Sequence, residues 1–118
     1  MNSQQQNILD NFHHPQNYGK PKSFTHHMRL ENPTCGDAVD MFLNLEDGKI
    51  VAANFEGEGC SISIASASLL TEELKGKSVA DVKAMTIEDM LKLLQIELSP
   101  ARRKCAHLSL EAAQKALT

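Results

Sequence analysis

Residues 38–57 read AVDMFLNLEDGKIVAANFEG, two apolar stretches joined by Asp47-Gly48. Asp-Gly is a preferred two-residue turn of β-hairpins, so this segment predicts antiparallel strands over 38–45 and 49–57. A weaker alternating stretch at 24–30, FTHHMRL, comes before them and predicts a further strand. Together these patterns indicate a three-stranded antiparallel sheet.

The segment before the strands predicts a short helix. It begins near SQQQNILDNF and is ended by Pro15 and Gly19, which do not continue a helix. Its expected apolar face consists of Ile8, Leu9 and Phe12.

The segment after the strands predicts a buried helix. Gly57 and Gly59 break the last strand, and residues 60–74, CSISIASASLLTEEL, follow with small or apolar residues on nearly every face. Such a composition is typical of a helix packed closely against its neighbours. Gly76 is expected to end this helix.

Two further helical regions complete the chain. Residues 78–94 carry apolar residues at helical spacing, and Ser78 and Thr86 are both suitable N-caps, so this region predicts one helix or two short ones. The last helix is expected to have Ser99 as its cap and Pro100 at its first position. A helix, three strands and then helices predict an α+β fold with the helices packed on the sheet.

The length of 118 residues suits one domain, 1–118. The net charge of -3 and the aromatic content of 4% argue against a nucleic-acid partner. No apolar run is long enough to span a membrane, and the N-terminus lacks the pattern of an export signal. We therefore expect a monomer in the cytoplasm, where cysteines stay reduced.

Each of the three cysteines lies next to a structural break. Cys35 lies in the turn segment NPTCGD, Cys60 follows Gly-Glu-Gly at the start of a helix, and Cys105 falls near the first or second turn of the last helix. A thiol near a helix N-terminus is favoured as the thiolate. With Asp37, two residues beyond Cys35, the three thiolates would make a closed zinc site or a site for iron and sulfide.

Spacing alone leaves this interpretation open. The chain has no Cys-x-x-Cys pair, and its cysteine spacings match no zinc finger, so three separate structural cysteines are the alternative. Arg102 would share a helical face with Cys105 and would offset the negative charge of a four-ligand site. The histidines are expected at the surface or at the sheet edge; they are His13, His14, His26, His27 and His107.

Four segments together resemble the U-type iron–sulfur assembly proteins, the IscU/SufU/NifU N-terminal family. They are ILDNFHHPQNYG, NPTCGD, GEGCSISIASAS and PARRKCAHL. The resemblance implies an α+β domain in which Cys35, Asp37, Cys60 and Cys105 are the metal ligands. It also implies Zn2+ and/or a transient [2Fe-2S] cluster on the cysteines, and sulfur supplied by a PLP-dependent cysteine desulfurase.

The chain differs from the family pattern in two places. Lys104 stands before the third cysteine, as in SufU-type members, where IscU-type members have histidine. The insertion that SufU proteins carry between the second and third cysteines is missing, so the length is IscU-like. The segment LSPARRK replaces the IscU chaperone-recognition stretch, which argues against a dedicated Hsp70 partner.

The resulting hypothesis is a sulfur relay or a cluster scaffold. Cys35 would accept persulfide sulfur, Arg102 would be auxiliary, and iron–sulfur recipient proteins would be downstream partners. Lys104 favours a zinc-bound sulfur acceptor, and the IscU-like length favours a scaffold. A non-catalytic, zinc-stabilised adaptor module is the alternative from another class.

Overall fold

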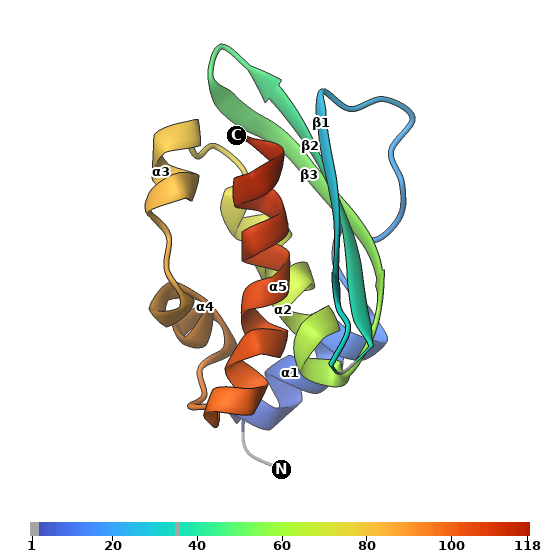
Figure 1. Cartoon of the computed structure of the whole chain (residues 1–118), viewed down its shortest axis with the longest axis vertical. Coiled ribbons are helices and arrows are strands. Elements are labelled where there is room, and N and C mark those ends of the chain that lie inside the picture. Colours follow the sequence, from blue (N-terminus) through green and yellow to red (C-terminus); the bar gives the residue numbers. More distant parts are fainter. Residues whose placement is uncertain (1–2, 35) are drawn as a thin grey trace.

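A computed structural model describes residues 3–34 and 36–118 of the chain. The elements in chain order are α1 (Ser3–His13), β1 (His26–Asn32), β2 (Asp37–Glu46), β3 (Lys49–Glu58), α2 (Ser61–Leu74), α3 (Val79–Ala84), α4 (Ile87–Leu94) and α5 (Pro100–Ala116). Figure 1 shows a layer of three strands with α2 and α5 lying against one of its faces. The predicted α+β class is confirmed.

The sheet is antiparallel in the order β1-β2-β3, as the hairpin pattern predicts. Asp47 and Gly48 form the turn between β2 and β3 and have φ angles of 52° and 76°. Positive φ at both turn residues matches the right-handed twist of the strands on either side. β2 and β3 both lie within one residue of their predicted bounds.

The prediction for β1 is wrong by two residues, because the strand covers 26–32 and not 24–30. The reason lies in side chains that the local pattern does not reveal. The ring of Phe24 lies 5.0 Å from the ring of Phe42, while the Thr25 hydroxyl donates to the Leu43 carbonyl at 3.1 Å. Phe24 and Thr25 therefore contact the sheet before the regular strand begins, and the Thr25 N–H also donates to the Leu43 carbonyl at 3.0 Å.

The core lies between the sheet and the helices, and α2 runs through it. Residues 62–68 of this helix are buried without interruption, which confirms the helix predicted from small and apolar residues. Completely buried side chains from the sheet, α2, α4 and α5 pack together in this core; they include Met41, Leu43, Phe55, Leu70, Leu74, Met90 and Leu110.

Helix α1 packs against α2 through a face that is partly polar. Ile8 is buried as predicted, while Leu9 and Phe12 are half-buried. Asn11 is buried as well, which the apolar pattern does not predict. Its side-chain oxygen accepts a hydrogen bond from the Ser68 hydroxyl at 2.6 Å, so the buried amide is satisfied.

The region 78–94 forms two short helices, α3 and α4. Ser78 and Asp81 form a reciprocal capping box at the start of α3, and the Asp89 carboxylate accepts the Thr86 N–H at 2.8 Å at the start of α4. Ser99 occupies the N-cap of α5 as predicted. Its hydroxyl makes no capping bond to the described residues, so only its backbone carbonyl serves as acceptor.

The end of the sheet opposite the β2–β3 hairpin brings three segments together. β2 begins there, β3 ends there and leads into α2, and the first turns of α5 lie alongside (Figure 1). Within residues 3–34 and 36–118, no helix is long and apolar enough to cross a membrane.

Candidate metal centre

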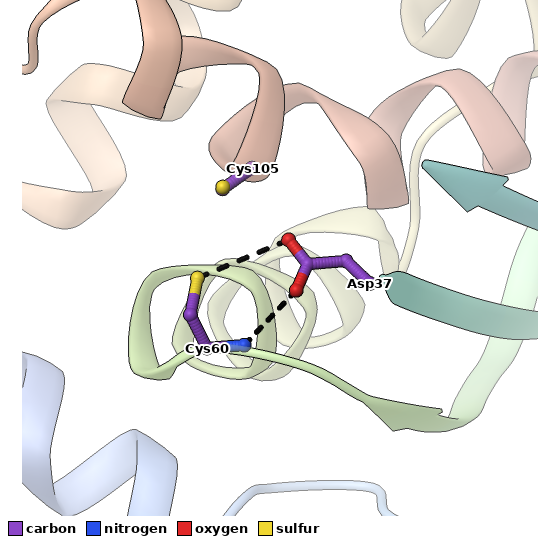
Figure 2. Close-up of side chains that lie close together, drawn as sticks. All are labelled: Asp37, Cys60 and Cys105. Carbon is purple, nitrogen blue, oxygen red and sulfur yellow. Dashed lines mark hydrogen bonds between the residues drawn. The ribbon is translucent and has the colours of Figure 1, made fainter. Parts of the chain in front are cut away.

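Asp37, Cys60 and Cys105 converge at this end of the sheet. One ligand atom from each, a carboxylate oxygen and two sulfurs, lies within 4.8 Å of the others. Figure 2 shows the three side chains pointing toward one another from β2, the start of α2, and α5. Three elements that are distant in sequence thus supply one group of metal-binding atoms.

Asp37 is the first residue of β2, and its side chain is buried, with 1% of the residue exposed. Its Oδ1 accepts the backbone N–H of Cys60 at 3.0 Å, and its Oδ2 lies 3.9 Å from the Cys60 sulfur (Figure 2). Cys60 is the N-cap residue of α2, so this N–H lies at the N-terminus of the helix. The positive end of the helix therefore stabilises the carboxylate on one side.

Cys60 occupies the N-cap of α2, which confirms its predicted place at the start of a helix. Its backbone carbonyl accepts the Ile64 N–H at 3.2 Å, and its N–H donates to Asp37. Both backbone groups are therefore engaged. The half-buried thiol is held at the helix end by a fixed backbone.

Cys105 lies in the second turn of α5 and is only 6% exposed. Burial raises the pKa of this thiol well above its ordinary value, and the neighbouring Asp37 and Cys60 raise it further. The expectation that the start of the helix would favour a Cys105 thiolate is therefore wrong for the metal-free chain. Burial is the largest cause of the raised pKa, followed by the contacts with Asp37 and Cys60.

Gly59 was not expected to take part in the site, yet it contacts the site directly. Its φ is +154°, and a Cβ added there would lie 2.8 Å from Cγ of Asp37. From sequence, Gly59 is expected only to break the last strand. The sequence links Gly59 to the site only through its position directly before Cys60.

Cys35 lies outside the described residues, but the structure describes both of its neighbours. The Gly36 N–H donates to the Asn32 carbonyl at 2.8 Å, and the Thr34 N–H donates to the Asn32 side chain at 3.2 Å. Asn32 and Asp37 are paired in the register of β1 and β2. The chain on either side of Cys35 is thus anchored at the same end of the sheet.

The basic residues before Cys105 differ in their surroundings. Arg102 is exposed, and its auxiliary role remains a prediction. Arg103 lies 3.6 Å from Glu88 and donates to the Leu98 carbonyl at 3.3 Å, which ties the start of α5 to its neighbours. Lys104 lines a groove of about 320 Å³; the other lining residues are Glu31, Asn32, Pro33, His107, Leu108 and Glu111.

Among the described residues, no histidine joins the group of Asp37, Cys60 and Cys105. His13 and His14 are exposed at the end of α1, and His107 is half-buried in the groove. His27 lies on β1, where its Nε2 is 2.8 Å from the Asp40 carboxylate.

Comparison with known proteins agrees with this fold. Residues 3–118 match the NifU-like N terminal domain family. The chain is 36% identical to the zinc-dependent sulfurtransferase SufU of Bacillus subtilis, over 92% of this chain and 84% of the relative. It is 31% identical to the iron-sulfur cluster assembly scaffold protein IscU of Escherichia coli, over 93% of this chain and 88% of the relative.

A solved structure shows the same architecture. The crystal structure of a putative iron-sulfur cluster assembly scaffold protein for the SUF system from Fervidobacterium islandicum superposes with a TM-score of 0.82 at 26% identity. The superposition covers 95% of this chain and 94% of the other. The fold, the converging site and these relatives define the class: this chain belongs to the NifU-like N-terminal domain family, which includes relatives named SufU and IscU.

Proposed function

We propose that this protein accepts sulfur from a PLP-dependent cysteine desulfurase and passes it toward iron–sulfur recipient proteins. The ligands of its metal site would be Cys35, Asp37, Cys60 and Cys105. The observation that carries the proposal is the approach of three ligand atoms to within 4.8 Å from three separate elements. The relative named zinc-dependent sulfurtransferase supports the sulfur-transfer role. Free thiols at such a site require a reducing compartment, which favours the cytoplasm.

The residues fit a zinc ion. Zn2+ takes four ligands drawn from cysteine sulfur, histidine nitrogen and carboxylate oxygen. A buried Asp37 carboxylate lies against Cys105, whose thiol resists ionisation in the metal-free chain. A cation at this position would offset the negative charge of the Asp37 carboxylate and of the cysteines once they lose their protons. When bound, zinc would keep the cysteines as thiolates at neutral pH.

The transfer step is assigned to Cys35. Its thiolate would attack the terminal sulfur of a persulfide carried by the desulfurase. A new S–S bond forms on Cys35, the S–S bond on the desulfurase breaks, and the desulfurase cysteine leaves as a thiolate. Arg102, three residues before Cys105 on an exposed part of α5, would provide positive charge near the site during this exchange.

A cluster scaffold is the second candidate function, and the relatives named IscU favour it. In that role Cys35, Cys60 and Cys105 would hold a transient [2Fe-2S] cluster. Lys104, in place of histidine before Cys105, favours the role of sulfur acceptor. The segment LSPARRK stands in place of the IscU chaperone-recognition stretch, so we do not expect a dedicated Hsp70 partner.

The test is transfer of labelled sulfur from a cysteine desulfurase supplied with labelled cysteine. We expect the wild-type chain to take up the label and Cys35→Ala to lose it. Asp47→Ala, in the distant hairpin, is the matched control and should keep the wild-type rate. Label on Cys35→Ala at the wild-type rate would contradict the assignment.

Metal and sulfide analysis of the anaerobically isolated protein separates the candidate roles. About one zinc per chain without iron is the result expected of the sulfur acceptor. Iron with matching sulfide would identify a scaffold. Zinc whose removal unfolds the chain, without any sulfur uptake, would identify the adaptor alternative.

A further inference from the structure

The Asp37 carboxylate lies in the space that a side chain at position 59 would occupy. A Cβ added to Gly59 would lie 2.8 Å from Cγ and 3.1 Å from Cβ of Asp37, and closer still to Oδ1. Cβ contacts under 3.0 Å are essentially never found in proteins. The carboxylate can take its present position only because residue 59 is glycine.

A second contact involves the same carboxylate oxygen. The Cys60 N–H donates to Oδ1 of Asp37 at 3.0 Å, and this N–H belongs to the residue that directly follows Gly59. The same short segment therefore supplies both the space for the carboxylate and the donor that holds it. Oδ2 is left facing the Cys60 sulfur at 3.9 Å.

From this geometry we infer that Gly59 is a positioning residue for Asp37. Its missing side chain sets the direction of the carboxylate, and thereby makes Asp37 available as a ligand beside Cys60 and Cys105. The metal-binding part of this inference rests on the proposed function. The positioning part concerns the metal-free chain and is independent of that proposal.

Other glycines of the chain serve different purposes. A Cβ at Gly57 would lie 2.7 Å from the Ala38 carbonyl oxygen, so this glycine allows close approach of strand backbones. A Cβ at Gly76 would meet nothing within 4 Å, although its φ is +86°. Gly76 therefore serves the backbone conformation alone and provides a matched control for the cost of an unfavourable φ.

The first test is the amide proton resonance of Cys60 in the metal-free protein. This proton is hydrogen-bonded to a carboxylate, and we expect both Asp37→Ala and Gly59→Ala to shift it upfield. Gly76→Ala should leave it in place. A Cys60 resonance unchanged in folded Gly59→Ala would overturn the inference.

The second test is a double-mutant cycle on zinc affinity, measured by competition with a chelator. We expect Gly59→Ala to weaken zinc binding at least about tenfold, as is typical when the support of a ligand is lost. In the Asp37→Ala background the same substitution should have little further effect, because the displaced group is gone. Equal losses in both backgrounds would overturn the inference.

Two further outcomes are informative. If Gly59→Ala does not fold, Gly59→Ala combined with Asp37→Ala should fold, since most of the collision is removed; failure of both would contradict the inference. Absence of zinc binding by the wild type would contradict the proposed function. The Cys60 amide test would still decide the role of Gly59.

Discussion

The two ends of the sheet use glycine in different ways. At the hairpin end, Gly48 has a φ of +76°, and a Cβ added there would meet nothing within 4 Å. At the site end, Gly59 has a φ of +154°, and its missing Cβ is replaced by the carboxylate of Asp37. Gly48 is needed only for the backbone conformation of its own turn. Gly59 also accommodates a residue from another strand.

This difference separates the stability of the fold from the chemistry of the site. The hairpin turn is exposed, and its conformational requirement is met by Asp47 and Gly48 alone. The site end buries Asp37 and Cys105 at the junction of β2, α2 and α5. We therefore expect substitutions at the hairpin to change stability only, and substitutions at the site end to change metal binding.

The largest effect is expected for Cys60→Ala. Loss of one sulfur ligand should weaken zinc binding by more than about 100-fold, the upper range for substitutions that only support a ligand. Asp47→Ala at the hairpin should bind zinc like the wild type. Competition with a chromophoric chelator measures both affinities. Equal affinities for wild type and Cys60→Ala would show that Cys60 is not a zinc ligand.

A smaller effect, on the free energy of unfolding, is expected from the raised pKa of Cys105 in the metal-free chain. Below an ordinary thiol pKa of 9.0 this group is protonated in the folded and the unfolded chain alike. Above it, the unfolded chain loses the proton and the folded chain keeps it. The free energy of unfolding should therefore fall as the pH rises, by up to about 1.4 kcal/mol per pH unit.

Denaturant unfolding at about pH 8 and about pH 10, on wild type and Cys105→Ala, checks this expectation. The variant should lose less stability between the two values, since it lacks the group in question. Equal losses would mean that Cys105 ionises as easily in the folded chain as in the unfolded one.

The smallest effect on zinc binding is expected for Gly48→Ala at the hairpin. An alanine held at positive φ should lower the free energy of unfolding by about 1–2 kcal/mol. Zinc affinity should remain that of the wild type, because the turn lies at the far end of the sheet (Figure 1). A weakened zinc site in this variant would show that the two ends are coupled.

The elements that could be predicted from sequence are those whose signals are local. Asp47-Gly48 predicts the hairpin, and Thr86 as a suitable N-cap allowed for the break between α3 and α4 without deciding between one helix and two, because each residue acts on its own backbone. β1 was misplaced by two residues because Phe24 and Thr25 contact the sheet through tertiary interactions. The burial of Asn11 was missed for the same reason, since its partner Ser68 lies on another helix.

The candidate site was predictable as a set of residue types but not as a geometry. Cysteines at structural breaks, with Asp37 beside one of them, suggested a metal site, and the resemblance to a family selected the ligand set. The raised pKa of Cys105 depends on burial between elements, and the role of Gly59 depends on where Asp37 points. Both properties arise only when β2, α2 and α5 come together.

The most direct test of the metal site is X-ray absorption spectroscopy at the zinc edge of the zinc-loaded protein. We predict three sulfur neighbours at about 2.3 Å and one oxygen neighbour at about 2.0–2.2 Å. In Asp37→Ala the three sulfurs should remain and the oxygen contribution should change. A zinc ion surrounded mainly by nitrogen and oxygen, or a spectrum unchanged in Asp37→Ala, would contradict the account.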